Sequence, residues 1–87
     1  MPTIDNRYDI ELGLLGEKVK KLRIALGLSQ LLLAEKIGVE RSEISKIENG
    51  KQNVQFRTLI RLADALAVET YELLAPDLSL TSLKLEV

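Results

Sequence analysis

The chain has 87 residues, enough for one domain with a thin core, and it contains neither cysteine nor histidine. Those absences exclude disulfides, thiolate nucleophiles, soft metal sites and histidine-based acid–base chemistry, so we expect no catalytic, metal or cofactor site. No apolar run approaches the roughly 20 residues that a membrane span needs, and no signal-peptide pattern follows Met1.

The net charge is −1, but the charged residues are distributed unevenly along the chain. Residues 14–62 hold ten Lys and Arg against five Asp and Glu, a net charge of +5, and the remaining residues carry −6. A locally basic surface attracts a phosphate backbone over a Debye length of about 10 Å. An ordinary solvated surface with acidic ends gives the same pattern, so charge alone leaves both interpretations open.

Apolar and polar residues alternate over residues 8–14, which is the period of a strand. We therefore predict a strand over residues 7–12, within an N-terminal arm of residues 1–13. An early start of the following helix is the alternative, but Gly13 and Gly16 argue against one continuous helix.

Helical periodicity begins next. The apolar residues at steps of four, three and four are Leu15, Val19, Leu22 and Leu26. They predict a helix over residues 15–26, ended by Gly27. The lysines of this helix and Arg23 fall on its remaining faces. We expect most of these lysines to be solvated, and contact of one or two of them with a phosphate is the alternative.

Residues 29–50 are typical of two short helices joined by a tight turn. Ser29 is a good N-cap for a helix over residues 30–37, because its hydroxyl can accept a bond from a first-turn N–H. Gly38 follows at once and permits the left-handed backbone that an abrupt turn needs. Val39 is apolar and can fill the space between the two helices.

The second helix of the pair is expected over about residues 40–48, and Asn49-Gly50 ends it. Ile44 and Ile47 share its inner face. The side chains expected on or beside the opposite face are Arg41, Ser42, Ser45 and Lys46.

Two further helices are predicted, over residues 56–66 and 70–74, and Pro76 prevents continuation of the second. The residues expected to complete the core are Leu59, Leu62, Ala63, Leu66, Val68, Leu73 and Leu74. In the C-terminal tail, residues 76–87, leucines alternate in two phases, which favours short strands. One hypothesis pairs residues 82–87 with residues 7–12, within the chain or across a dimer, and disorder of the tail is the alternative.

The paired helices resemble the helix-turn-helix of Cro and phage-repressor-type (XRE-like) DNA-binding domains. The residues that match the family pattern in register are Ser29, Gln30, Leu33, Ala34, Gly38, Val39, Ile44, Ser45, Ile47, Glu48, Asn49 and Gly50. With its flanking helices the resemblance covers about residues 15–74. It implies an all-α, five-helix lambda-repressor-like DNA-binding domain over residues 14–75, to which the two ends add possible short β-strand arms.

The resemblance implies a sequence-specific transcriptional regulator of double-stranded DNA, with repression as the expected effect, in a bacterial-type cytoplasm. It would bind a pseudo-palindromic operator as a homodimer, with the helix over residues 40–48 in the major groove. The alternative is an antitoxin or other protein-interaction module that binds a partner protein through its apolar ends. An enzyme has little support, since no cluster of convergent carboxylates and no phosphate-cradling loop is present.

Base contacts are expected from the outer face of the second helix. Arg41 can pair with guanine O6 and N7 through two parallel bonds, and Lys46 can reach a guanine or a phosphate. Ser42 and Ser45 are short enough for close approach. For Arg41 the alternative is a surface salt bridge with a glutamate, Glu43 or Glu48.

The resemblance also implies contacts to the DNA backbone. The residues at the matching positions are Gln30, Lys51, Gln52 and Asn53. Glu48 and Asn49 are expected to tie and cap the second helix.

The chain departs from the family pattern at several positions. Leu31 and Leu32 stand where polar residues are usual, so we expect the N-terminal arm or a partner subunit to cover them. Gln55 is a weak N-cap, and Ala67 occupies a position where glycine is common, at a cost of about 1 kcal/mol if its backbone is left-handed.

Overall fold

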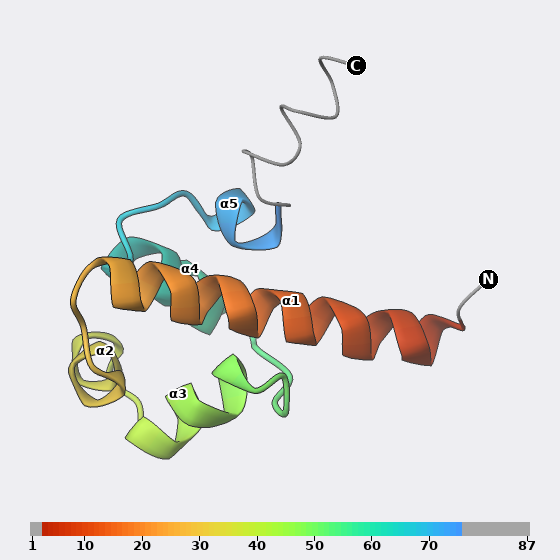
Figure 1. Ribbon diagram of the computed structural model, residues 1–87, viewed down its shortest axis with the longest axis horizontal. Coiled ribbons are helices and arrows are strands. Elements are labelled where there is room, and N and C mark those ends of the chain that lie inside the picture. Colours follow the sequence, from red (N-terminus) through yellow and green to blue (C-terminus); the bar gives the residue numbers. More distant parts are fainter. Residues whose placement is uncertain (1–2, 76–87) are drawn as a thin grey trace, which may run out of the picture.

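A computed structural model describes residues 3–75, which form five helices and no strand. In chain order the helices are α1 (Ile4–Ala25), α2 (Gln30–Ile37), α3 (Arg41–Glu48), α4 (Phe56–Ala65) and α5 (Thr70–Leu74) (Figure 1). The all-α, five-helix prediction is confirmed. The predicted strands of the C-terminal tail, residues 76–87, lie outside the described residues.

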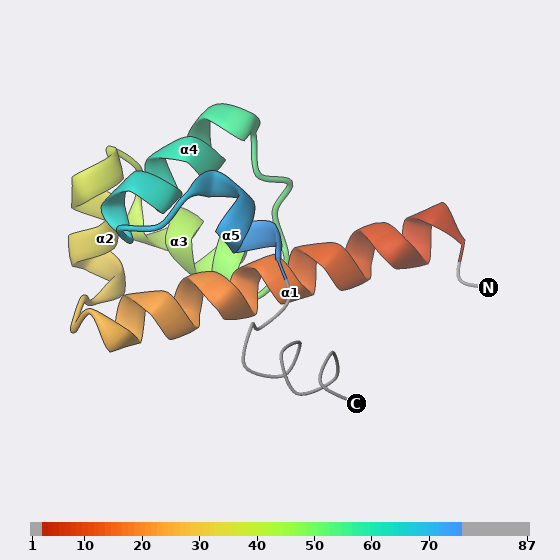
Figure 2. The same ribbon diagram turned by 90° about the horizontal axis from the view of Figure 1, so that it is seen from above.

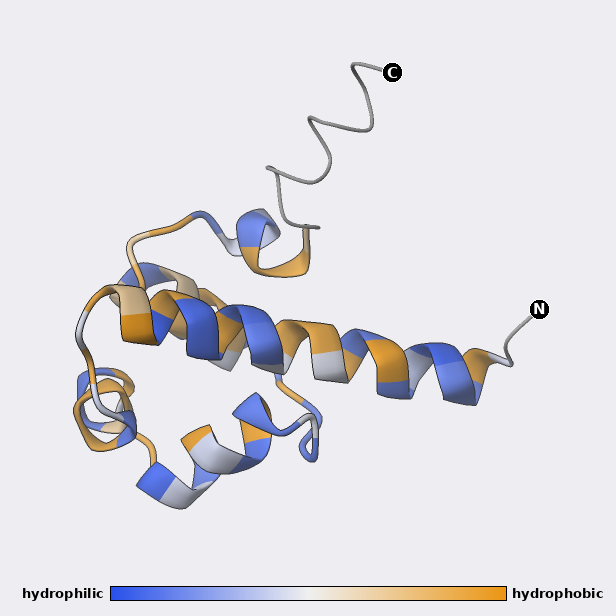
Figure 3. Ribbon diagram, in the orientation of Figure 1, coloured by the Kyte–Doolittle hydropathy of each residue, from blue (hydrophilic) through white to orange (hydrophobic). Residues whose placement is uncertain are grey.

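The five helices pack around one another in pairs, with the long helix α1 along one side of the domain (Figure 2). Helices α3 and α5 both pack against α1, α2 packs against α3 and α4, and α4 packs against α5. The first turns of α1 project beyond the rest of the domain in both views (Figures 1 and 2). Exposed apolar residues continue along this projecting part, among them Ile4, Tyr8, Ile10 and Leu14. Figure 3 shows hydrophobic and hydrophilic residues interspersed along this end of the α1 ribbon.

The strand predicted over residues 7–12 is wrong, because these residues belong to α1. The Thr3 hydroxyl oxygen accepts a bond from the Asn6 N–H at 3.2 Å, which caps the helix at its true start. Apolar residues at helical spacing reach back from the core-facing stripe to Leu12 and Tyr8, and this period overrides the local alternation. The hypothesis that residues 7–12 pair as a strand with the tail is therefore wrong as well.

Gly16 lies inside α1 for a packing reason rather than as a helix breaker. A Cβ atom here would lie 2.6 Å from the backbone carbonyl oxygen of Glu48, and closer still to that of Ile47. The missing side chain therefore lets the C-terminal end of α3 rest directly on α1.

The core matches the sequence prediction at most positions. Its buried apolar residues are Leu15, Val19, Leu33, Ala34, Ile37, Ile44, Ile47, Leu59, Leu62, Ala63, Leu66 and Leu73. Leu26 and Leu74 were expected inside but are 50% and 57% exposed. Leu26 already lies past the last turn of α1, and Leu73 occupies the core position of the short α5.

Local signals set the ends of the middle helices as predicted. The Ser29 hydroxyl oxygen accepts a bond from the Leu32 N–H at 3.0 Å, and Gly38 has a left-handed backbone with φ of 76°. Gln55 makes no side-chain capping bond to α4. Ala67 takes φ of 62°, the strained left-handed conformation expected there.

Leu31 and Leu32 are exposed, as their sequence position suggested. The N-terminal residues do not cover them, because α1 begins at the end of the molecule away from α2 (Figure 1). The expectation of a covering arm is therefore wrong for the described residues.

Candidate nucleic-acid interface

Helix α3 has one anchored face and one open face. Ile44 and Ile47 are 0% and 1% exposed and hold the inner face in the core. On the opposite side lie the exposed Ser42 and Lys46 and the half-buried Ser45. Arg41, the fourth predicted base-contacting residue, is exposed at the N-terminal edge of the helix. The helix forms an edge of the domain, and no other helix of residues 3–75 lies over its outer side (Figure 1).

The C-terminal end of α3 is capped from within the chain. The Asn49 side-chain amide donates to the carbonyl oxygen of Ser45 at 2.8 Å. Gly50 then takes the left-handed conformation, with φ of 67°, while Asn49 keeps a negative φ. The predicted capping role of Asn49 is confirmed, and it acts through its side chain.

A buried ion pair joins α1 to α3. Arg23 Nε donates to Glu48 Oε2 at 2.6 Å and its Nη2 donates to Glu48 Oε1 at 3.1 Å. Nη1 of the same guanidinium donates to the carbonyl oxygen of Leu28 at 2.8 Å, so the loop before α2 is held as well. The hydrogen bond to Glu48 raises the pKa of Arg23 above its usual value, against the opposing effect of burial.

The position predicted for Arg23, away from the core-facing stripe of α1, is thus wrong, and the tying role predicted for Glu48 is confirmed. A signal was available in the sequence. Arg23 follows Val19 by four residues, as Val19 follows Leu15, and so falls on the buried face of α1. An arginine at such a position requires a buried acceptor elsewhere in the chain.

The ion pair continues outward to the surface of α3. Gln30 Nε2 donates to Glu48 Oε1 at 3.1 Å, and Gln30 Oε1 accepts from Arg41 Nη1 at 3.0 Å. The predicted alternative for Arg41, a salt bridge with Glu43 or Glu48, is therefore replaced by a hydrogen bond to a neutral amide. Sequence reasoning named Gln30 and Arg41 separately and missed this bond between them.

The loop after α3 starts against that helix, because the Lys51 N–H donates to the carbonyl oxygen of Lys46 at 2.9 Å. Lys51 and Asn53 are exposed and Gln52 is half-buried. Residues from α3, this loop and α4 line a hollow beside them: Glu43, Gln52, Asn53, Val54, Gln55 and Thr58. Three of the predicted phosphate contacts thus follow directly after the C-terminal end of α3, and the fourth, Gln30, lies beside α3 with bonds to Glu48 and Arg41.

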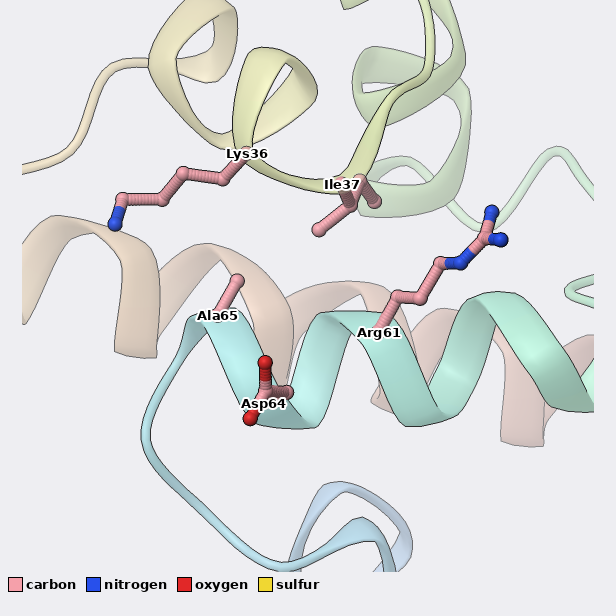
Figure 4. A pocket seen from close by; sticks show the side chains of 5 residues that line it. All are labelled: Lys36, Ile37, Arg61, Asp64 and Ala65. Carbon is pink, nitrogen blue, oxygen red and sulfur yellow. The ribbon is translucent and has the colours of Figure 1, made fainter.

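A second hollow lies between α2 and α4, lined by Lys36, Ile37, Arg61, Asp64 and Ala65 (Figure 4). The side chains of Lys36 and Arg61 point away from each other there, so they do not converge on a ligand. Within residues 3–75 there is no group of acidic side chains suited to hold a metal ion. Over the same residues, no helix has the length and apolar character to cross a membrane.

Comparison with known proteins agrees with this geometry. A family model described as helix-turn-helix matches residues 19–73. The chain belongs to the helix-turn-helix family. The resemblance predicted from residues 29–50 is confirmed, and the projecting first turns of α1 lie outside the family match.

Several relatives of this helix-turn-helix chain are named as regulators. An SPbeta prophage-derived uncharacterized HTH-type transcriptional regulator, YonR of Bacillus subtilis, is 38% identical over 55 residues, which are 63% of this chain and 51% of the relative. Control protein C.SmaI of Serratia marcescens is 41% identical over 74 residues, 85% of this chain and 88% of the relative. The chain spans about half the length of the first curated relatives that it matches.

The restriction-modification controller protein C.AhdI from Aeromonas hydrophila has a similar solved structure. The TM-score is 0.71 at 39% identity, over 74% of this chain and 97% of that one. These proteins share a helix-turn-helix domain with this chain, and they are named as a transcriptional regulator and as controller proteins.

Proposed function

We propose that this protein is a sequence-specific transcriptional regulator that binds a pseudo-palindromic operator as a homodimer and represses transcription. The recognition element is α3, lying in the major groove of double-stranded DNA. We expect it to act in the cytoplasm, where the DNA of bacteria lies.

The observation that carries the proposal is the two-sided character of α3. Ile44 and Ile47 fix the helix to the domain, while its outer side carries two serines and a lysine and its N-terminal edge an arginine, and no other helix of residues 3–75 covers them. A helix of this kind meets the two needs of groove readout, which are rigid support and side chains that reach base edges.

Within this proposal, Arg41 pairs with guanine O6 and N7, and Lys46 reaches a guanine or a phosphate. Ser42 and Ser45 allow close approach and bond to a base or a phosphate. Backbone contacts come from the loop after α3, through the residues Lys51, Gln52 and Asn53.

A homodimer is part of the proposal because two copies of α3 would then read two half-sites about one helical turn of DNA apart. The named controller proteins among the relatives support a small regulator of this kind. Light scattering of the isolated protein tests this directly: a mass of two chains is expected, and a monomer at micromolar concentration that stays monomeric on DNA would overturn it.

Selection of bound duplexes from a random pool, at a stated salt concentration, tests the whole proposal. We expect enrichment of one sequence with two-fold symmetry and a half-site spacing near one turn. Failure to enrich any sequence, together with a stable complex with another protein, would favour the alternative of an antitoxin or other interaction module.

A more specific role also has support. Control proteins match this chain over most of their own length, 88% for C.SmaI and 80% for C.MunI of Mycoplasma sp. The match covers only about half of YonR and of an uncharacterized transcriptional regulator from the ATPase CF(0) region of Rhodospirillum rubrum. We infer that the regulated genes are those of a restriction-modification system. The enriched sequence should then occur upstream of such genes in the source genome, and its absence there would remove this role while leaving the regulator intact.

A further inference from the structure

The projecting end of α1 carries an apolar stripe that the rest of residues 3–75 leaves largely open. Ile4, Tyr8 and Leu12 precede the buried Leu15 and Val19 at helical spacing, so all five residues lie on one side of α1. Ile4 and Tyr8 are 77% and 46% exposed, and Leu12 is half-buried. A core-facing stripe that continues past the core is typical of a helix with a further packing partner.

The position of α3 on α1 favours a second copy of the chain as that partner. A helix rises about 1.5 Å and turns about 100° per residue, so Gly16 lies about 12 Å along α1 from Tyr8 and about 80° round it. The C-terminal end of α3 rests on Gly16, and α3 therefore lies beside the stripe rather than in front of it.

This placement decides the direction in which two α1 ends can pair. If they run in opposite directions, the two-fold axis passes near Tyr8 and is perpendicular to the plane of both helices, so both α3 copies lie on the same face of the dimer. If they run in the same direction, the axis lies along the helices and turns the two α3 copies to opposite faces. Only the first arrangement lets both copies of α3 meet one DNA duplex.

The spacing of the two α3 copies also agrees with DNA. With about 12 Å on each side of the axis, the C-terminal ends of α3 would be about 24 Å apart along the paired helices. From that end α3 extends towards the C-terminal end of α1, over about 12 Å (Figure 1). The midpoints of the two α3 copies would then lie up to about 36 Å apart, and half-sites one turn of DNA apart need about 34–36 Å.

The charged residues beside the stripe leave most of the pairing energy to its apolar side chains. On one edge, Arg7 and Glu11 form an exposed ion pair at 3.9 Å. In helices that run in opposite directions the same edges meet, so Arg7 of each copy comes within reach of Glu11 in the other copy. On the other edge, Asp5 and Asp9 meet the same residues of the second copy, at the cost of a screened repulsion.

We propose that the projecting end of α1 is a dimerisation surface, on which the stripe of Ile4, Tyr8 and Leu12 packs against the same stripe of a second copy in the opposite direction. This inference rests on the proposed function, because it names the surface that joins two copies of α3 on the operator. The family match begins at residue 19, so this surface lies outside the part of the chain that the family model covers.

A charge placed in the stripe tests the proposal. We expect Tyr8→Glu to raise the dimer dissociation constant by about 10- to 30-fold, because it removes an aromatic anchor from the centre of the interface. The matched control is Ile10→Glu, since Ile10 is 55% exposed and lies about 200° round the helix from Tyr8. It should leave the dissociation constant unchanged. Sedimentation equilibrium of the full chain measures both.

Cysteine cross-linking tests the direction of pairing, and it remains informative if Tyr8→Glu folds poorly. The chain contains no cysteine, so a disulfide can form only at the introduced positions. After mild oxidation, a mixture of Ile4→Cys and Leu12→Cys proteins should give linked dimers of one copy of each. Linked dimers from Ile4→Cys alone would indicate pairing in the same direction and would overturn the proposal.

The outcomes distinguish this surface from the proposed function. If the parent is a dimer that Tyr8→Glu leaves intact, the proposed surface is wrong, while selection of an operator by the parent would still support the regulator. If the parent dimerises through Tyr8 but selects no DNA sequence, the surface stands and the proposed function fails. If the parent is a monomer and Tyr8→Glu lowers its Tm, the stripe is covered by residues 76–87 of the same chain, which would also overturn the proposal.

Discussion

Glu48 receives three donated hydrogen bonds on one buried carboxylate, two from Arg23 and one from Gln30. Both charged side chains of the pair are taken out of water, so each depends on the other for compensation. Their pairing fixes the end of α3 against α1, and with it the direction in which the outer face of α3 points. This residue therefore links the stability of the domain to the geometry of its interface.

Removal of one member of the pair should be costly. We expect Glu48→Ala to lower the free energy of unfolding by about 3–5 kcal/mol, because the Arg23 guanidinium is left buried without its partner. Urea unfolding followed by circular dichroism measures this loss. The control is the double variant Arg23→Met with Glu48→Leu, which should recover much of the stability; a single variant within about 1 kcal/mol of the parent would contradict the account.

At this scale the sequence was informative about single residues and weak about pairs. Lys46 and Ile44 could be placed on opposite sides of α3, because the helical period alone decides that. The bond between Arg41 and Gln30 could not, since residues 30 and 41 meet only when the turn between α2 and α3 has its actual geometry. The period gives a buried position for Arg23, but a local pattern does not identify its buried acceptor, Glu48, which is 25 residues away in the sequence.

The projecting helix α1 illustrates the same limit at the scale of an element. Residues 7–12 satisfy both a period of two and, read together with Leu15 and Val19, a helical period. Gly13 and Gly16 argued for the strand, because glycine lowers helix stability. The physical reason for Gly16, the close approach of α3, depends on tertiary packing that a local pattern does not contain.

The two glycines of α1 should respond in opposite ways to alanine. In Gly16→Ala the new Cβ meets the carbonyl oxygens at the end of α3, so we expect a loss of about 1–3 kcal/mol. At Gly13 a Cβ meets nothing within 4 Å, so Gly13→Ala should add about 0.5–1 kcal/mol through helix propensity. Thermal unfolding of both variants checks the pair, and equal shifts in Tm would show that α3 does not rest on Gly16.

The turn after α4 contains a strained residue. Ala67 adopts φ of 62°, which an alanine side chain disfavours by about 1–2 kcal/mol. Ala67→Gly should therefore raise the free energy of unfolding by about 1 kcal/mol. The matched control is Ala25→Gly at the exposed end of α1, which should not raise the free energy of unfolding. A lower Tm for Ala67→Gly than for the parent would show that the backbone at Ala67 is not strained.

The whole molecule combines a net charge of −1 with a basic central segment. Long-range attraction to DNA depends on the local field rather than the total, since charges more than a Debye length apart are screened. Lys46 and Lys51 are both exposed on and just after α3, with a backbone bond joining the two positions. The acidic residues at the ends of the chain therefore do not preclude binding to a phosphate backbone.

Lys51 tests that argument through the dependence of binding on salt. Lys51→Ala should weaken binding to every duplex alike and reduce the slope of log K against log salt by about one unit per protomer. Lys36→Ala, which removes the same charge from the hollow between α2 and α4, serves as the control and should leave the slope unchanged. Equal slopes for Lys51→Ala and the parent would exclude a phosphate contact from this lysine.

The central claim is that α3 reads base edges through Arg41. Its most direct test is the base preference of Arg41→Ala on the selected operator, measured beside Arg61→Ala, which removes another exposed arginine, from α4. We predict that Arg41→Ala costs about 1–3 kcal/mol on the operator and loses discrimination at one base pair of each half-site, while Arg61→Ala keeps it. Binding of Arg41→Ala with the affinity and base preference of the parent would contradict the claim.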